Sequence, residues 1–434
     1  MSALACPTSR LELQRKADGA LHCAESKVTY PNLGGVAWLW PDPAAALVDW
    51  RNRYNRLLAE LEADIDRASV GKDQLVNYQT QLTELLATLK VSEPRAKELH
   101  YALRTQLPDH HALDSYNTNI FRDWCWGEEE NQATLEHLNQ YLDDNYQDKS
   151  LLVLGSGAGR LAYDLHVHHR LQETYALDSN PLLSLIAQAM FTGKDLEFTE
   201  FPRAPVHHKS IQRTLQSPGA ERGIHSICAD AMHPPIAPGS IDVLVTSWLI
   251  DVLDAPLAAQ IQSYAGLLKP GGVWLNHGSL VFENRDIDAR LLEDDVRDLT
   301  AKNGFEVVSS ANAELPYLHS PDDRHKRLEL TYTQLARRTV ASVDAPNQPP
   351  PLPRWLSKTD QPVPRSDGFV SQITSTRVHA FILGLIDGER SIKDIASVME
   401  EQQLMPAREA VVAVQQILRV MYNEETAQGR QRNY

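Results

Sequence analysis

The sequence has little cysteine and no long apolar run. Its four cysteines, at positions 6, 23, 125 and 228, are too few and too scattered for a disulfide framework. No apolar stretch approaches the ~20 residues that span a bilayer, so we expect no membrane partner. The first residues lack the basic and apolar pattern of a secretory leader, so we expect a cytoplasmic location.

Basic residues are also scarce. The chain has 57 acidic and 42 basic residues and a formal net charge of −15. A surface this negative repels phosphate backbones, which makes nucleic acid a poor candidate substrate. With 434 residues, 42% hydrophobic and 23% charged, the composition is that of a globular protein with room for about three domains.

Residues 151–161 join a short apolar run to a glycine turn and the start of a helical pattern. Such a strand–turn–helix unit brings the backbone close to a ligand, and the helix N-terminus adds free N–H groups. Asp178 ends a second apolar run about 20 positions further on, where an acid can bind ribose hydroxyls. The turn comprises Gly155, Ser156, Gly157, Gly159 and Arg160.

Three more elements follow in the order of a nucleoside-binding α/β fold. Asp230 stands at the end of a third predicted strand, residues 241–250 form a fourth, and residues 267–275 form a helix end, a turn and a fifth strand. The whole run resembles the S-adenosylmethionine (SAM)-dependent methyltransferases more than a bare NAD-binding fold. The resemblance implies a class I, Rossmann-like α/β core that binds SAM and releases S-adenosylhomocysteine.

In that family the glycine turn holds the methionine part of SAM, the acid at 178 the ribose and the acid at 230 the adenine amine. Upstream of the turn, Arg122 could form a bidentate pair with the carboxylate of the methionine part. The alternative is a surface salt bridge to one of the glutamates at positions 128–130. The residues expected to bind the cofactor are Asn119, Arg122, Gly155, Ser156, Gly157, Gly159, Arg160, Asp178, Ser179, Asn180, Asp230, Ala231, Met232, Ser247 and Trp248.

We expect further modules around the core. The methyltransferase domain covers residues 146–340 and follows a helical segment, residues 44–145, whose apolar positions recur three and four apart. A proline-rich linker, residues 341–366, leads to residues 367–434, which resemble winged-helix-like docking or dimerisation modules. A long insert at residues 191–223 is expected to form part of the wall or cover of the substrate site.

Residues 1–43 resemble the small zinc-ribbon proteins that partner methyltransferases. A metal-binding ribbon carries Cys-x-x-Cys twice, but here Ser9 and Ser26 replace the second cysteine of each pair, which leaves Cys6 and Cys23. Two thiolates and two hydroxyls make a poor zinc site, so we expect a scaffold module without metal. The paired histidines elsewhere in the chain lack metal-ligand spacing, and no metal is expected at all.

Several phrases are similar to those of the carnosine N-methyltransferase family, over roughly residues 115–335. They are Arg122-Asp-Trp124, the glycine turn, Ser247-Trp-Leu-Ile-Asp251 and Leu267-Leu-Lys-Pro-Gly-Gly-Val-Trp-Leu-Asn-His-Gly-Ser-Leu280. The family methylates the π nitrogen of a histidine imidazole, and the resemblance implies that Asp251 holds that imidazole as the catalytic residue. A carboxylate that accepts the τ N–H leaves the π lone pair free and stabilises the charge that develops on the ring. The alternative role for Asp251 is the N-cap of the following helix.

The substrate contacts of that family are only partly present. Its Tyr-His pair after Gly-x-Leu, whose histidine binds a peptide carboxylate, is replaced here by Val281-Phe-Glu-Asn284. We therefore expect a histidine-derived small molecule, either a thio- or selenohistidine of the ovothiol type or a carnosine-like dipeptide. The residues expected to bind it are Asp251, Asp254, His277, Phe282, Tyr317 and His319.

Two other functions stay open at this point. The terminal modules would suit an enzyme that docks a partner protein or forms a homodimer, and that methylates a histidine or an amine in a peptide or protein. The third possibility is a catalytically silent SAM-binding regulatory protein, against which the intact glycines and both acids argue.

Overall fold

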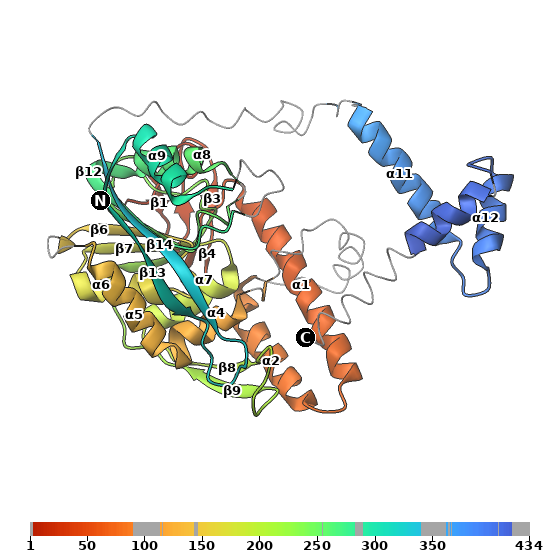
Figure 1. Cartoon of the computed structure of the whole chain (residues 1–434), viewed down its shortest axis with the longest axis horizontal. Coiled ribbons are helices and arrows are strands. Elements are labelled where there is room, and N and C mark those ends of the chain that lie inside the picture. The colour runs from red at the N-terminus through yellow and green to blue at the C-terminus, as the bar shows by residue number, and fades with distance from the viewer. Residues whose placement is uncertain are drawn as a thin grey trace. The chain divides into compact units, whose positions relative to one another are not determined.

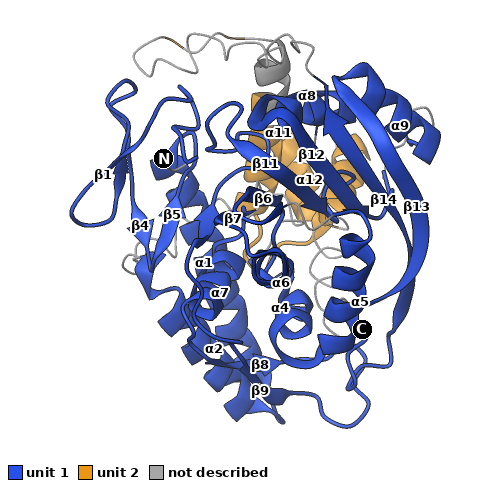
Figure 2. Ribbon diagram, turned by 90° about the vertical axis from the view of Figure 1, so that its left-hand side faces the viewer, with its two compact units in different colours: residues 1–347 blue, residues 348–434 orange. Residues whose placement is uncertain are grey.

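The structure is a computed structural model of the chain (Figure 1). It describes residues 3–89, 113–114, 116–142, 146–253, 255–282, 290–339, 362, 365, 367–406 and 408–418. These residues fall into two compact units, residues 1–347 and 348–434, which Figure 2 shows in different colours. Each unit has its own hydrophobic core.

A large sheet organises the first unit. Its parallel strands β10, β7, β6, β11 and β12 are neighbours in that order, and β14 runs antiparallel between β12 and β13. This is the strand arrangement of the class I SAM-dependent methyltransferase fold, and it confirms the predicted Rossmann-like α/β core. The sheet strands in the described chain are, in spatial order, β13 (Phe305–Tyr317), β14 (Arg327–Arg338), β12 (Leu268–Gly278), β11 (Ile241–Ser247), β6 (Ser150–Leu154), β7 (Glu173–Asp178), β10 (Ile224–Cys228), β5 (Val36–Trp38) and β4 (Asn32–Leu33).

Side chains on the parallel strands alternate between two buried faces. On β6, Leu151 and Val153 enter one core cluster, whereas Leu152 and Leu154 enter the other. The face of Leu152 is covered by α8 (Leu257–Leu267) and α9 (Glu293–Lys302). Figure 1 shows these two helices side by side. The helices that join the other cluster are α1 (Pro43–Arg67), α2 (Lys72–Leu85), α4 (Asn117–Phe121), α5 (Glu128–Asn139), α6 (Arg160–His169) and α7 (Pro181–Phe191).

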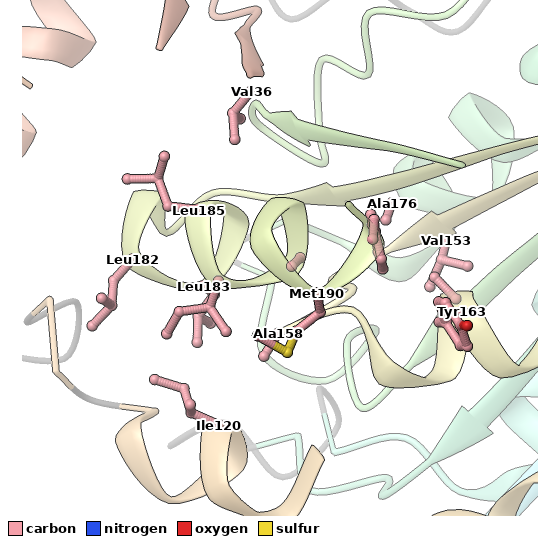
Figure 3. Packing of buried hydrophobic residues seen from close by; sticks show 14 of the residues in the cluster. Val36, Ile120, Val153, Ala158, Tyr163, Ala176, Leu182, Leu183, Leu185 and Met190 are labelled. Carbon is pink, nitrogen blue, oxygen red and sulfur yellow. The ribbon is translucent and has the colours of Figure 1, made fainter. Parts of the chain in front are cut away.

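Helix α7 is apolar nearly all round, which is typical of a helix buried between two layers. It begins with Pro181 after Asn180, whose side chain accepts a hydrogen bond from the Leu182 backbone at 2.9 Å. Figure 3 shows Leu183 and Met190 of α7 within the cluster that also contains Ile120 of α4. The helical segment upstream of the sheet therefore packs against the core through α7.

The first segment of the chain extends the main sheet. Its strand β5 pairs in parallel with β10, with Ala37 opposite Ile227, and β4 pairs antiparallel with β5. This pairing covers the β10 edge, which would otherwise present free backbone groups. Three shorter strands form a separate antiparallel sheet: β1 (Gln14–Arg15), β2 (Leu21–His22) and β3 (Thr29–Tyr30).

The two cysteine–serine pairs of this segment lie in contact across its loops. Cys6 Sγ is 3.6 Å from Ser26 Oγ, and Cys23 Sγ is 3.4 Å from Ser9 Oγ. The Tyr30 hydroxyl lies 3.1 Å from Cys6 Sγ, and both cysteines are buried. Hydrogen bonds therefore join each cysteine to the serine that follows the other cysteine.

The long insert of the core domain folds into a hairpin of β8 (Leu196–Glu200) and β9 (Ile211–Leu215). Thr199 hydrogen-bonds Gln81 of α2 through its backbone N–H, at 2.9 Å. Beyond β8, the carboxylate of Asp323 accepts hydrogen bonds from the backbone of Arg203 at 2.8 Å and of Ala204 at 3.2 Å. The insert is thereby fastened to the connection between β13 and β14. Its strand β9 also contacts η3 (Arg122–Trp126), a single π-helical turn.

The second unit is helical where the structure describes it. Helices α11 (Asp367–Gly384) and α12 (Ile392–Glu401) are followed by a helical stretch at residues 408–418. Ser391 caps α12 in a reciprocal arrangement with Asp394, and the core of the unit contains Ile382, Met399 and Val414. The predicted linker lies outside the described residues except at positions 362 and 365. Within the described ranges, none of the helices combines the length and apolar character needed to cross a membrane. In the first unit, a short 3-10 turn, η1 (Ala87–Leu89), follows α2.

Candidate functional site

The glycine turn lies between β6 and α6, at the carboxyl edge of the sheet. Gly155, Gly157 and Gly159 all have positive φ, at 67°, 59° and 92°. A Cβ on Gly155 would lie 2.9 Å from a Leu249 methyl, and one on Gly159 would lie 2.7 Å from the Phe191 ring. A Cβ on Gly157 would meet nothing nearer than 3.9 Å, so the middle of the turn is open above the backbone. The turn can therefore receive a ligand at the N-terminus of α6.

Asp178 ends β7 beside this turn. Its Oδ2 accepts a hydrogen bond from the Gly157 backbone at 2.9 Å, and its Oδ1 accepts one from the Asn180 backbone at 2.8 Å. Burial raises the pKa of Asp178 to about 6, against the backbone hydrogen bonds, which lower it. Hydroxyl groups of a bound ribose could donate to this carboxylate and offset the cost of burying its charge.

The next acid lies on the neighbouring strand. Asp230 follows β10, and the backbone N–H of Ala229 donates to the carbonyl of Asp178 at 3.0 Å, which places both acids at one edge. The Asp230 carboxylate accepts from the Met232 backbone at 2.8 Å and lies 2.7 Å from Nδ1 of His233. Of the other residues predicted to bind the cofactor here, Ala231 is buried and Ser179 is exposed. The side chain of Asn180 instead caps α7.

Arg122 belongs to a buried ion-pair cluster. Its guanidinium lies 2.7 Å from Asp123 and 3.6 Å from Glu130, and it stands over the Tyr317 ring at 5.9 Å. Burial raises the pKa of Asp123, whereas Arg122 lowers it. The structure thus contains the salt bridge to a glutamate that the sequence left as the alternative, together with a second carboxylate. Asn119 lies one turn earlier on α4 and is half-buried.

Arg160, the first residue of α6, ties the turn to the same π-helical segment. It forms a bidentate pair with Asp164 at 2.9 and 2.8 Å, and it donates to the carbonyl of Asp123 at 3.1 Å. Its guanidinium also bonds Glu128 at 2.9 Å and lies over the Trp124 ring at 5.6 Å. Its contacts with Asp123 and Trp124 therefore join the start of α6 to η3.

Trp248 follows β11 in a strained backbone conformation. Its φ is 54°, which is uncommon for a bulky residue, and its N–H donates to the carbonyl of His277 at 2.8 Å. A Cβ on Gly278 would lie 2.8 Å from the Trp248 nitrogen, so glycine is required opposite it. The indole packs against the Tyr317 ring at 4.3 Å between ring centroids. Because Arg122 stands over the same Tyr317 ring, Trp248 and the Arg122 cluster share this neighbour. Ser247, just before it, is half-buried.

Asp251 is anchored by one oxygen only. Its Oδ2 accepts hydrogen bonds from Ser279 Oγ at 2.5 Å and from the Val281 backbone at 2.9 Å. Its Oδ1 is buried and has no hydrogen-bond partner among the described residues. The following helix, α8, takes Pro256 as its N-cap, so Asp251 does not cap it. A carboxylate oxygen that is fixed, buried and unpaired can accept a hydrogen bond from a ligand.

His277 lies at the carboxyl end of β12 and is 1% exposed. Its Nδ1 is 2.9 Å from Thr333 Oγ1, and that hydroxyl is also 2.8 Å from Nε2 of His137 on α5. Burial, and next the nearby His137, lowers the pKa of His277 to about 3, so the ring is neutral. Its Nε2 has no hydrogen-bond partner among the described residues.

Two other predicted substrate residues, Phe282 and His319, have contacts of a different kind. Phe282 packs against the core cluster under α8 and α9, and Nε2 of His319 is 2.6 Å from the carbonyl of Arg327 at the turn beyond β13. Asp254 lies outside the described residues. The structure therefore brings His277 and Tyr317, both predicted to bind the substrate, into contact with Trp248, which was predicted to bind the cofactor. Asp251 is tied to Ser279, two residues after His277.

Three residues of the site were missed by sequence reasoning. Ser279 and Asp123 stand inside the phrases that resemble the carnosine N-methyltransferases, so the signal for them was present. Thr333 lies in the middle of β14, in a stretch without a motif, and only its register opposite His277 reveals it.

Two of the histidines in the run 166–169 have hydrogen-bond partners within the protein. His166 bonds Thr174 Oγ1 at 2.9 Å and the carbonyl of Arg222 at 3.0 Å, and His169 bonds Asn139 at 2.9 Å. Among the residues that the structure describes, no three or more His, Cys, Asp or Glu side chains form a group that could hold a metal ion.

Comparisons with known proteins give likenesses of fold. No family model matches the chain, and no curated protein matches it. Among solved structures, it is similar to a Haemonchus contortus phosphoethanolamine N-methyltransferase 2 bound to phosphomonomethylethanolamine and S-adenosylhomocysteine (14% identity, 48% of this chain, 47% of that chain, TM-score 0.35). The match thus spans about half the length of that enzyme.

Two further similar structures are microbial. One is a SAM-dependent methyltransferase of Methanosarcina mazei (15% identity, 47% of this chain, 98% of that chain, TM-score 0.34). The other is a complex that contains the Haloferax volcanii Trm112 methyltransferase activator (13% identity, 53% of this chain, 98% of that chain, TM-score 0.37).

Proposed function

We propose that this chain is a SAM-dependent N-methyltransferase that acts on the imidazole π nitrogen of a histidine-derived small molecule. The observation that carries the proposal is the carboxylate of Asp251. One oxygen is held by Ser279 and Val281, and the other is buried and free to accept a hydrogen bond. It stands beyond the same sheet edge as the glycine turn, where ligands of open α/β sheets bind.

The residues of the turn fit the cofactor. Asp178 offers a carboxylate to the ribose hydroxyls, Asp230 offers one to the adenine amine, and the open space over Gly157 admits the methionine part. Arg122 already pairs with Asp123, and the carboxylate of the cofactor would share its guanidinium. When bound, SAM supplies a methyl group that its sulfonium has already activated.

Asp251 would fix the tautomer and the orientation of the acceptor imidazole. Neutral imidazole has one N–H and one lone pair, so a carboxylate that accepts the τ N–H leaves the lone pair on the π nitrogen. As the N–C bond forms and the C–S bond breaks, positive charge develops on the ring, and the buried carboxylate stabilises it. In-line positioning of the two reactants is worth up to about 7–11 kcal/mol in favourable systems.

The acceptor is a free histidine derivative under this proposal. A thio- or selenohistidine of the ovothiol type and a carnosine-like dipeptide both present the ring that Asp251 would hold. The family histidine that binds a peptide carboxylate has no counterpart at residues 281–284. The absence of that histidine from the sequence favours the single amino acid over the dipeptide.

Methyl-labelled SAM tests the proposal directly. The purified full-length chain is incubated with histidine, carnosine, thiohistidine and selenohistidine derivatives and a histidine-containing peptide. We expect label in one free imidazole, on the π nitrogen by NMR. SAM binding without transfer to any acceptor would support the silent regulatory protein instead.

A second candidate is methylation of a histidine or amine in a peptide or protein. The unit of residues 348–434 has a hydrophobic core of its own, as a docking or dimerisation module requires. Label that enters a protein of a cell lysate, with none in the free imidazoles, would establish this candidate.

A further inference from the structure

The environment of His277 differs from that of the other buried histidine with a threonine partner. In His166, Nδ1 lies 2.9 Å from Thr174 Oγ1 and Nε2 lies 3.0 Å from the carbonyl of Arg222. In His277, Nδ1 has the same 2.9 Å contact, with Thr333, but Nε2 has no partner within the described ranges. His166 is thus a satisfied structural residue, whereas His277 leaves a buried polar atom unpaired, which costs free energy unless a ligand completes it.

The unpaired nitrogen faces the acceptor region. Thr333 lies opposite His277 on β14, and Ser247 lies opposite it on β11. Since Nδ1 points at Thr333 and the two ring nitrogens diverge widely, Nε2 points away from β14. Two rings lie next to His277: His137, which shares the Thr333 hydroxyl and is 5.6 Å away between centroids, and the Trp248 indole, edge-on at 6.0 Å. Asp251 is tied to Ser279, two residues after His277.

The hydroxyl of Thr333 governs which form of His277 is available. It has one hydrogen and two histidine neighbours, at 2.9 Å and 2.8 Å. When Thr333 donates to Nε2 of His137, it accepts from Nδ1–H of His277, and Nε2 of His277 then carries a lone pair. This arrangement satisfies the Thr333 hydroxyl and Nδ1 of His277 and leaves Nε2 of His277 as a hydrogen-bond acceptor without a partner among the described residues.

The charge and hydrogen-bonding capacity of His277 Nε2 determine which group of a ligand it can bind. His277 is fully buried and neutral, so it offers no positive charge to a carboxylate. A neutral imidazole nitrogen accepts well from an ammonium group, and the electron-rich Trp248 ring beside it also attracts a cation.

We propose that His277 is a specificity-determining residue whose Nε2 accepts a hydrogen bond from the α-ammonium group of the acceptor amino acid. The proposal rests on the proposed function and deepens it. Asp251 holds the ring, and His277 holds the amino group of the same molecule. An acceptor without a free amino group then leaves Nε2 unpaired and is discriminated against.

The test changes the enzyme at His277 and the methyl acceptor at its amino group, separately and together. The full-length chain and its variants are assayed for methyl transfer to the best acceptor of the panel and to its des-amino analogue. For the wild type we expect kcat/KM to fall roughly 10- to 100-fold with the des-amino compound, the usual effect of losing a hydrogen bond to a charged group. In His277→Phe we expect both compounds to react at the same, low rate.

Three further variants keep the result interpretable. His277→Gln retains an acceptor oxygen and should recover part of the preference for the amino compound. Thr333→Val keeps the shape of the side chain but frees the tautomer of His277, and should reduce the preference. His166→Phe removes the matched histidine–threonine pair and should leave the preference at its wild-type value. Binding of SAM, measured by calorimetry, checks that each variant is folded.

The outcomes separate the two proposals. Methyl transfer to a free imidazole with a preference for the amino compound that survives in His277→Phe overturns the role of His277 and leaves the proposed function intact. Absence of transfer to every free imidazole by the wild type overturns both. Loss of the preference in His277→Phe, with its retention in His166→Phe, establishes the contact.

Discussion

The carboxylate of Asp178 accepts a hydrogen bond from the backbone of Gly157 at 2.9 Å, so the acid after β7 is fastened to the turn after β6. The contact has an electrostatic consequence. The carboxyl is buried, and its pKa rises from the ordinary value of 3.8 to about 6. Between these values the folded chain binds a proton that the unfolded chain releases. The stability that this group contributes is therefore complete below about pH 4 and is lost as the pH rises through about 6.

Cofactor affinity should have the opposite pH dependence. Ribose hydroxyls donate to the ionised carboxylate, so we expect SAM binding to weaken as the pH falls through about 6, by up to tenfold per pH unit. Calorimetric titrations between pH 5 and 8, in one buffer series, measure this. Asp178→Asn cannot ionise, and its affinity should be low and nearly independent of pH. An equal pH dependence in wild type and Asp178→Asn would contradict the assignment.

Asp251→Asn should leave SAM binding within about twofold of wild type and reduce turnover by ~100-fold or more, the usual effect of removing one preorganised polar group. The matched control is Asp242→Asn, at the opposite end of β11, where the carboxylate accepts from Ser150 and pairs with Lys269 at 2.7 Å. That variant should lose stability and retain turnover. Wild-type turnover in Asp251→Asn would remove the basis of the proposed mechanism.

Gly278→Ala should destabilise the protein by about 1–3 kcal/mol, since the new Cβ would lie 2.8 Å from the Trp248 nitrogen at a φ of 144°. Gly266→Ala is the control. Gly266 lies within α8 at an ordinary φ, and its Cβ would meet nothing within 4 Å, so that change should stabilise by about 0.5–1 kcal/mol. Urea unfolding of both variants gives the two free energies. Equal stability of the two would show that Trp248 does not require the glycine.

Ser9→Cys combined with Ser26→Cys should create a zinc site. Thiolates at 2.3 Å from a tetrahedral ion are about 3.8 Å apart. The present separations of 3.6 Å between Cys6 and Ser26, and of 3.4 Å between Ser9 and Cys23, are close to that value. We expect one zinc per chain after dialysis, and a melting temperature that a chelator lowers. A folded double variant that retains no zinc would show that the loops cannot close around an ion.

The sequence predicts the core of the fold because its signals are local. The glycine turn, the acids at strand ends and the apolar runs each lie within a few residues of one another, and the sheet order follows from them. Pairings between distant segments leave no such signal. Nothing near Trp38 indicates that β5 lies beside β10, and nothing near Thr333 indicates that its hydroxyl lies between two histidines. The same holds for the positive φ of Trp248, which depends on the glycine across the sheet.

The pairing of β5 with β10 also affects how the chain acquires its structure. Ala37 and Ile227 are partners in the sheet, yet 190 positions (227 − 37) separate them. During synthesis, the first segment emerges with an edge strand whose partner has not been made. Loop closure over so long a distance is slow compared with the formation of local helices. The first segment can therefore join the sheet only after the glycine turn, β7 and α7 are in place, which makes this edge a late event in folding.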